Sequence, residues 1–244
     1  MSIPRLSIVI PAYNEALRLP PSLQLVKAWI LAQPFEVEVV IVDDGSKDAT
    51  VALAKSSLAG FRHQVILHER NRGKGAGIKT GMSAALGEFV LFSDADLSTP
   101  IDEASRFLAA HAAGAVIVIG TRKSKGAQVL KRQSFIRENM GKVFTLLSNL
   151  LVCPGISDFT CGFKCFRADA CRAIFSLQCE EGWAYDSEVL FLARRLRYPV
   201  TELPVKWVND DSSRVNLLRD SVGSLVGLLR IRLRALRGGY GKRP

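Results

Sequence analysis

The chain has 244 residues, of which 48% are apolar and 23% are charged. These values are typical of a globular protein and exclude a chain that is disordered throughout. The net charge of +10 is uneven, because residues 216–244 hold seven basic side chains and one acidic side chain. A basic tail on a nearly balanced body indicates a polyanionic partner such as anionic lipid, nucleic acid or phosphate.

The sequence predicts neither a membrane span nor a secretory signal. No window of about 18 uninterrupted apolar residues occurs, and the first apolar run stops at Pro11 without a signal-type cleavage site. The five cysteines form no CxxC pair and have no histidine among them. We therefore expect reduced thiols in a cytosolic protein rather than a zinc site.

Short apolar strands alternate with helices in the first half of the chain. Strands are expected at residues 6–10, 37–42, 65–68, 88–93 and 116–120, and helices at 16–32, 49–59, 77–86 and 101–113. This alternation predicts an α/β fold with a mostly parallel sheet covered on both faces. Ligands of such sheets bind at the carboxyl ends of the strands.

The second half is less regular. It suggests a basic segment running into a helix that ends near 151, a loop or strand at 158–166, a helix at 184–196, a strand at 200–208 and a last helix at 215–236. We divide the chain into a main domain, residues 1–214, and an amphipathic basic C-terminal helix and tail, residues 215–244.

Asp94 and Asp96 follow a buried strand and are separated by one residue. Two carboxylates so placed can reach one hard divalent cation, and Mg²⁺ or Mn²⁺ held in this way usually also binds substrate phosphates. A helix cap is the alternative for Asp96. The strand-end position, beside further carboxylates at Asp43 and Asp44, favours the metal site.

Asp43 and Asp44 close the second strand, where an acid can accept hydrogen bonds from a base or a ribose. A cap for the next helix explains one of the two acids but not both. The glycine-rich segment 71–77 is not a P-loop, since Ile78 precedes the Lys-Thr pair. It leaves Arg72 and Lys74 on a loop beside the phosphate region.

Basic residues follow the fifth expected strand. Arginine forks fit phosphate oxygens, although a solvated helix face is the usual alternative for such a run. Arg137 is the hardest to dismiss, because it lies within an apolar stretch. The run comprises Arg122, Lys123, Lys125, Lys131, Arg132 and Arg137.

The last helix is amphipathic. At about 100° per residue, its apolar side chains fall within one half-circle and Arg219, Arg230, Arg234 and Arg237 gather on the other side. This pattern is typical of a helix lying on anionic lipid. A helix that packs on its own domain is the alternative. The apolar residues are Leu217, Leu218, Val222, Leu225, Leu228, Leu229, Leu233 and Leu236.

Taken together, the sequence resembles family 2 glycosyltransferases of the GT-A fold, and among them the polyprenyl-phosphate and dolichyl-phosphate hexose synthases. The matching stretches include VIPAYNE (9–15), VDDGSKDAT (42–50), NRGKGAGIKTGM (71–82), DADLSTP (94–100) and DFTCGFKCF (158–166). DADLSTP and MGKVF (140–144) look closer to the glucosyl branch than to the mannosyl branch.

The resemblance implies a nucleotide-sugar donor, a divalent metal and transfer with inversion. Asp94 and Asp96 would bridge to the metal and the diphosphate, and Arg214 would close over the diphosphate. Arg122, Arg132 and Arg137 would hold the acceptor phosphate. Contacts to the nucleoside and its surroundings would come from Pro11, Tyr13, Glu15, Asp43, Asp44 and Lys74.

The expected reaction is transfer of glucose from UDP-glucose to a polyprenyl phosphate by a peripheral protein on the cytoplasmic face of a membrane. The acceptor phosphate is largely ionised at neutral pH and needs no dedicated base. In this reading Asp96, Arg122, Arg137 and Arg214 carry the catalysis.

Several alternatives remain. One is a GDP-mannose-dependent mannosyltransferase, and another is a transferase with a hydroxyl acceptor that uses Asp186 or Glu188 as the base. A third is a nucleic-acid-binding protein that uses the basic tail. We expect no nucleic-acid partner, because Tyr240 is the only aromatic residue in the tail. A homo-oligomer is left open.

Overall fold

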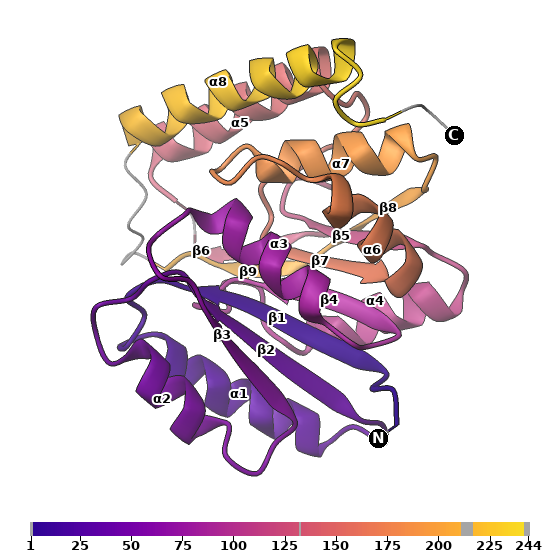
Figure 1. The fold of residues 1–244 in the computed structure, drawn as a ribbon. Helices are drawn as coiled ribbons and strands as arrows, with labels where there is room; N and C mark the ends of the chain where they lie inside the picture. The colour runs from indigo at the N-terminus through magenta and orange to yellow at the C-terminus, as the bar shows by residue number, and fades with distance from the viewer. Residues whose placement is uncertain (1, 132, 211–216, 242–244) are drawn as a thin grey trace.

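The computed structural model describes residues 2–131, 133–210 and 217–241, and its centre is a seven-stranded sheet (Figure 1). The strands lie in the order β3-β2-β1-β4-β7-β5-β8. Their bounds are β1 Leu6–Ala12, β2 Val37–Asp43, β3 His63–Leu67, β4 Phe89–Ser93, β5 Ile117–Thr121, β7 Phe163–Arg167 and β8 Val200–Pro204. All neighbours are parallel except β7, which is antiparallel to both β4 and β5. The predicted α/β fold with a mostly parallel sheet is confirmed.

Helices cover both faces of the sheet, because successive side chains of its strands point to opposite sides. On β1, Ile8 and Ile10 pack in the same core as α1, α2 and α4, whereas Val9 packs in the core of α3, α6 and α7. Two further helices, α5 and α8, form a layer beyond α7 (Figure 1). The bounds are α1 Leu19–Leu31, α2 Thr50–Ser57, α3 Lys74–Ala84, α4 Glu103–Ala112, α5 Phe135–Leu151, α6 Ala168–Leu177, α7 Tyr185–Arg195 and α8 Leu217–Leu236.

Three elements differ from the sequence-based expectations. Helix α6 follows β7 directly and was not expected, because no glycine, proline or asparagine marks where the strand ends and the helix begins. The expected strand at 200–208 divides at Val205, since β9 (Lys206–Val208) leaves the main sheet and pairs with β6 (Gln128–Lys131). Strand β6 lies within the basic segment, where no strand was expected.

Helix α8 packs on the body along one stripe and exposes another. Leu228 and Ile231 are fully buried in the core shared with α7, so the alternative of a helix packed on its own domain holds for this stripe. The opposite stripe stays exposed, with Val222 at 64% and Leu236 at 73%. Within the described residues no helix is both long and apolar enough to cross a bilayer. The expected boundary between the main domain and the C-terminal helix, at residue 214, lies outside the described residues and stays a prediction.

Candidate active site

The carboxyl ends of β2, β1 and β4 lie side by side and bring three motifs together. In the sheet register Ala12 is opposite Asp43, and β4 adjoins β1 on its other side. Asn14 and Leu97 both take left-handed backbone conformations, with φ of 54° and 47°. Such conformations are uncommon for residues other than glycine and tend to occur at functional sites.

The two acids at the end of β2 have different surroundings. The carboxylate of Asp44 finds its hydrogen-bond partners within the chain. It accepts hydrogen bonds from the amides of Arg72 and Gly73, and it is hydrogen-bonded to His68 Nδ1 at 2.7 Å. Asp43 accepts from the amide of Ser46 through Oδ2. Its Oδ1 is buried and has no hydrogen-bond partner among the described residues. A buried acceptor without a partner is costly, so this oxygen is suited to a ligand donor.

Asp94 and Asp96 stand at the end of β4 beside Lys74, the first residue of α3. Lys74 Nζ donates to Asp94 Oδ1 at 2.5 Å, and the amide of Ser98 donates to Asp96 Oδ1 at 2.9 Å. Burial and then the charge of Asp94 raise the pKa of Asp96. Burial alone would lower the pKa of Lys74, but the surrounding carboxylates raise it.

The carboxylate of Asp94 lies against the backbone of Gly162. A Cβ atom at position 162 would stand 2.1 Å from Asp94 Oδ2, a distance that only glycine avoids without displacing the carboxylate. Gly162 lies in the matched stretch 158–166, but no local pattern indicates that it faces Asp94.

Glu15 is held by Arg18, which the sequence analysis did not single out. The guanidinium of Arg18 forms two hydrogen bonds with the Glu15 carboxylate and another, at 3.2 Å, with Asp210. Arg18 Nη1 also lies 3.7 Å from Asp96 Oδ2. Glu15 therefore holds the positively charged guanidinium of Arg18 next to the Asp94–Asp96 pair. Tyr13 on the same loop is 37% exposed.

Arg122 is paired with a buried acid. Its Nε and Nη2 donate to the two oxygens of Asp158 at 2.7 and 2.8 Å, and Nη2 also donates to Thr160 Oγ1. The guanidinium lies 5.2 Å from the ring centre of Trp207. Asp158 is fully buried; the cost of burial is outweighed by the charge of Arg122, which holds the pKa of Asp158 far below its usual range.

The other predicted arginines are placed less completely. Arg137 is partly buried on α5 and shares a helix face with the buried Ser148, eleven residues later. Arg132 and Arg214 lie outside the described residues.

Asp186 and Glu188, the alternative bases, differ in position. Asp186 is buried and forms an ion pair with Lys164, which also donates to the carbonyl of Cys161. Burial raises the pKa of Asp186, and Lys164 and then Lys74 oppose the shift. Glu188 lies toward α8, where its carboxylate accepts from the amides of Cys179 and Glu180 and from the hydroxyl of Tyr240.

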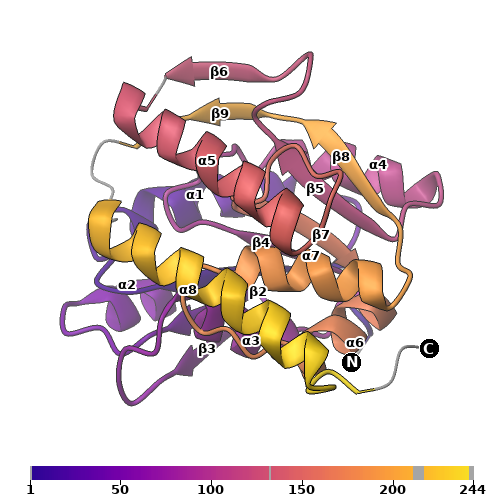
Figure 2. The same ribbon diagram turned by 90° about the horizontal axis from the view of Figure 1, so that it is seen from above.

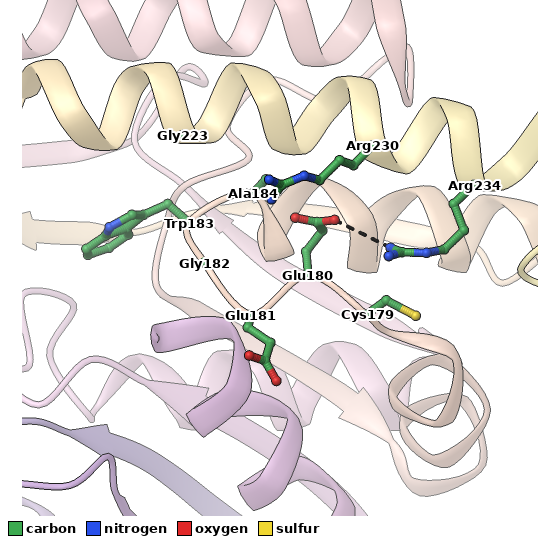
Figure 3. A pocket seen from close by; sticks show the side chains of 9 residues that line it. All are labelled: Cys179, Glu180, Glu181, Gly182, Trp183, Ala184, Gly223, Arg230 and Arg234. Carbon is green, nitrogen blue, oxygen red and sulfur yellow. Dashed lines mark hydrogen bonds and ion pairs between the residues drawn. The ribbon is translucent and has the colours of Figure 1, made fainter. Parts of the chain in front are cut away.

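The loop before α7 borders a cavity of about 570 Å³ under α8 (Figure 3). Arg234 of α8 donates to Glu180 at 3.4 Å, and Arg230 also points toward this loop. Trp183 stands at one end of the cavity, and Lys74 Nζ lies 5.5 Å from the centre of its ring. The cavity therefore adjoins the Lys74–Asp94 pair.

Within the described residues no three His, Cys, Asp or Glu side chains converge as a metal site. Asp94 and Asp96 nevertheless fit a divalent cation that also binds substrate phosphates, because Mg²⁺ in such sites takes only one or two carboxylates from the protein. The coupling of the two carboxylates, seen in the raised pKa of Asp96, indicates that both face the same small region.

Residues 7–175 match the model of the family described as glycosyl transferase family 2. The chain belongs to this family. The match covers β1 through most of α6, including the Asp43 and Asp94–Asp96 strand ends, so the predicted resemblance is confirmed and this family 2 glycosyltransferase is an enzyme.

Curated relatives extend the similarity of this glycosyltransferase to nearly its whole length. It is 32% identical over 248 residues to the dolichyl-phosphate beta-glucosyltransferase of Dictyostelium discoideum, covering 96% of this chain and 75% of the relative. It is 36% identical over 224 residues to the enzyme of the same name from Drosophila melanogaster, covering 86% and 69%.

Solved structures share the fold of this glycosyltransferase. Glucosyl-3-phosphoglycerate synthase from Mycobacterium tuberculosis superposes with a TM-score of 0.66 at 19% identity, covering 94% of this chain and 81% of that one. The same enzyme in complex with Mn²⁺, UDP and glucosyl-3-phosphoglycerate gives 0.65 at 20% identity, covering 94% and 80%.

Proposed function

We propose that this glycosyltransferase transfers glucose from UDP-glucose, with inversion, to the phosphate of a dolichyl-type polyprenyl phosphate. The observation that carries the proposal is the 32–36% identity to dolichyl-phosphate beta-glucosyltransferases over most of the chain. The strand-end carboxylates supply the donor site that such a reaction requires.

In the proposed donor site, Asp43 Oδ1 accepts a hydrogen bond from the nucleoside, and Pro11, Tyr13 and Glu15 line its surroundings. Asp94 and Asp96 hold Mg²⁺ or Mn²⁺, which when bound supplies positive charge to the leaving diphosphate. Lys74, which forms an ion pair with Asp94, is within reach of the same diphosphate. Arg214 is proposed to close over this diphosphate. Asp44 supports the site indirectly, because its hydrogen bonds hold the loop that leads to Lys74.

In the proposed acceptor site, arginines offset the repulsion between the acceptor phosphate and the donor diphosphate. Arg137 suits this role, since none of the ion pairs in the described part of the chain involves it. Arg122 contributes hydrogen-bond donors, although Asp158 already compensates the charge of its guanidinium. Arg132 remains part of the proposal. The ion pair of Asp186 with Lys164 favours a positioning role for Asp186 over that of a base.

The proposed membrane contact is the outer face of α5 and α8, which lie next to each other (Figure 2). On α5, Leu146 and Leu150 are 58% and 72% exposed, and on α8 Leu229 and Leu233 are 48% and 50% exposed. Arginines flank this apolar face on α8, and together the two features match an anionic bilayer surface. We place this surface on the cytoplasmic side of the membrane, with no nucleic-acid partner.

The test is to incubate the protein and Mg²⁺ or Mn²⁺ with polyprenyl phosphate in membranes and a panel of labelled nucleotide sugars. We expect label from UDP-glucose in the lipid extract. Label from GDP-mannose instead would establish the mannosyl alternative. Label only in water-soluble glycans would contradict the lipid acceptor.

A further inference from the structure

Four arginines surround a second cavity, of about 290 Å³, at the opposite end of α7 from Asp186. Arg194 and Arg195 belong to the last turn of α7, Arg197 follows that helix, and Arg232 comes from α8. The remaining lining residues are apolar: Val152, Pro154 and Phe191. Among the described residues, no acidic side chain lines this arginine cavity.

Two of the four arginines are held by neutral backbone carbonyls, and none of the four is paired with an acid among the described residues. Arg194 donates to the carbonyl oxygen of Pro154 at 3.0 Å, and Arg195 donates to that of Gly241. Arg195 Nε is buried without a hydrogen-bond partner among the described residues. In the part of the chain that the structure describes, none of the four forms an ion pair.

The polarity of α7 explains only part of this arrangement. A helix C-terminus attracts cations, which accounts for Arg194 and Arg195. It does not account for Arg232, which a different helix brings to the same cavity. Arg197 also takes a left-handed conformation, φ 63°, at a position where glycine or asparagine is usual. Four like charges repel one another, so a bound anion would stabilise the group.

The arginine cavity lies at the edge of the apolar face of α5 and α8. Val152 follows α5 two residues after the exposed Leu150, and Arg232 precedes the exposed Leu233. Arg195 is nine residues from Asp186 along α7, a rise of about 13 Å. The cavity is therefore separate from the carboxylate site, and it opens where lipid headgroups would lie if α5 and α8 meet a bilayer.

We propose that the arginine cavity binds a phosphate group, which guanidinium forks recognise through paired hydrogen bonds. The group can belong to an anionic lipid headgroup or to a free phosphate compound. The proposal is independent of the transfer reaction, because it uses none of the residues assigned to the donor or the acceptor.

The test compares the unmodified 244-residue chain with the variant R197Q/R232Q. This variant removes two exposed guanidiniums that form no hydrogen bond within the described chain. The control R172Q/K55Q removes the same charge from exposed positions on α6 and α2. Binding is measured by sedimentation with phosphatidylcholine vesicles containing phosphatidic acid, and by calorimetry with inorganic phosphate. Melting temperatures establish that all three proteins are folded.

We expect R197Q/R232Q to lose about tenfold in affinity for at least one of the two probes while the control loses less than about twofold. Loss toward inorganic phosphate would identify a free phosphate site. Loss toward vesicles alone would identify a headgroup site. Equal affinities of R197Q/R232Q and the control for both probes would overturn the proposal. Because no probe is a reactant, failure here leaves the transfer reaction untouched.

Discussion

Arg122 and Asp158 form a two-pronged ion pair, with nitrogen–oxygen distances of 2.7 and 2.8 Å, around a carboxylate that is fully buried. The side chain of Arg122 remains 17% exposed. It can therefore present its outer edge to a ligand while its charge stays balanced, and any substitution at this position affects folding as well as binding.

We predict that Arg122→Ala lowers the free energy of unfolding by about 3 kcal/mol, because it leaves the buried Asp158 with only Lys123, at 4.0 Å, as a cationic partner. The double variant Arg122→Gln/Asp158→Asn removes both charges and should recover much of that loss in a denaturant titration. In the recovered protein, the KM for polyprenyl phosphate should rise while the KM for the nucleotide sugar stays unchanged. An unchanged acceptor KM would remove Arg122 from the acceptor site.

Asp43→Asn and Asp44→Asn should give opposite results. The first replaces an unpartnered acceptor by a donor and should weaken UDP binding about tenfold in calorimetry, with little change in melting temperature. The second disturbs three hydrogen bonds within the chain and should cost about 1–3 kcal/mol of stability. If the Asp43→Asn variant binds UDP with unchanged affinity, the nucleoside does not contact Asp43.

The affinity for Mn²⁺ should fall as the pH is lowered. This fall should begin at a higher pH than it would for a site whose aspartates have their ordinary pKa. Asp96 must be ionised to bind the cation, and its raised pKa lets a proton compete earlier. The same shift stabilises the metal-free fold below the ordinary pKa of aspartate, and this contribution is lost as the pH rises through the pKa of Asp96 in the folded protein. Electron paramagnetic resonance of Mn²⁺ measures the affinity.

Asp96→Asn is the control for that pH dependence. It should bind Mn²⁺ weakly at every pH and show a flatter profile than the unmodified protein. A variant whose profile matches that of the unmodified protein would show that another group titrates.

Leu229→Asp/Leu233→Asp should greatly reduce flotation with anionic vesicles, because it places two charges on the outer face of α8. Leu25→Asp/Leu31→Asp makes the same change at exposed positions of α1, on the other side of the sheet, and should float normally (Figure 1). Equal flotation of the two variants would exclude this face as the membrane contact.

Much of the fold was predictable, and so was the grouping of acids at the ends of β2 and β4, because both depend on local patterns. Buried strands such as Val37–Asp43 show as short, mostly apolar runs, and the parallel arrangement places their terminal acids together. The different states of Asp43 and Asp44 were not predictable, since the loop after β3 decides which acid the chain uses.

The proposed acceptor side was less predictable, because the contacts of Arg122 and of the alternative base Glu188 join residues far apart in sequence. Asp158 lies 36 residues after Arg122, and nothing in the local pattern indicates that the two form a pair. Glu188 likewise meets Tyr240 across 52 residues, so its proximity to Asp186 in the sequence was misleading. Arg18 had a local signal, three residues after Glu15, but this spacing occurs on many exposed helices.

The loop 178–184 is fastened on both sides. On the α3 side, the side chain of Gln178 donates to the carbonyl of Gly75, and the amide of Ala76 donates to the carbonyl of Glu181. On the other side, the carboxylate of Glu180 accepts a hydrogen bond from Arg234 of α8. Any tilt that a bilayer imposes on α8 must therefore break the Arg234 contact or pull on the first turn of α3. That turn carries Lys74, so a single loop connects the proposed lipid surface to the proposed sugar-nucleotide site.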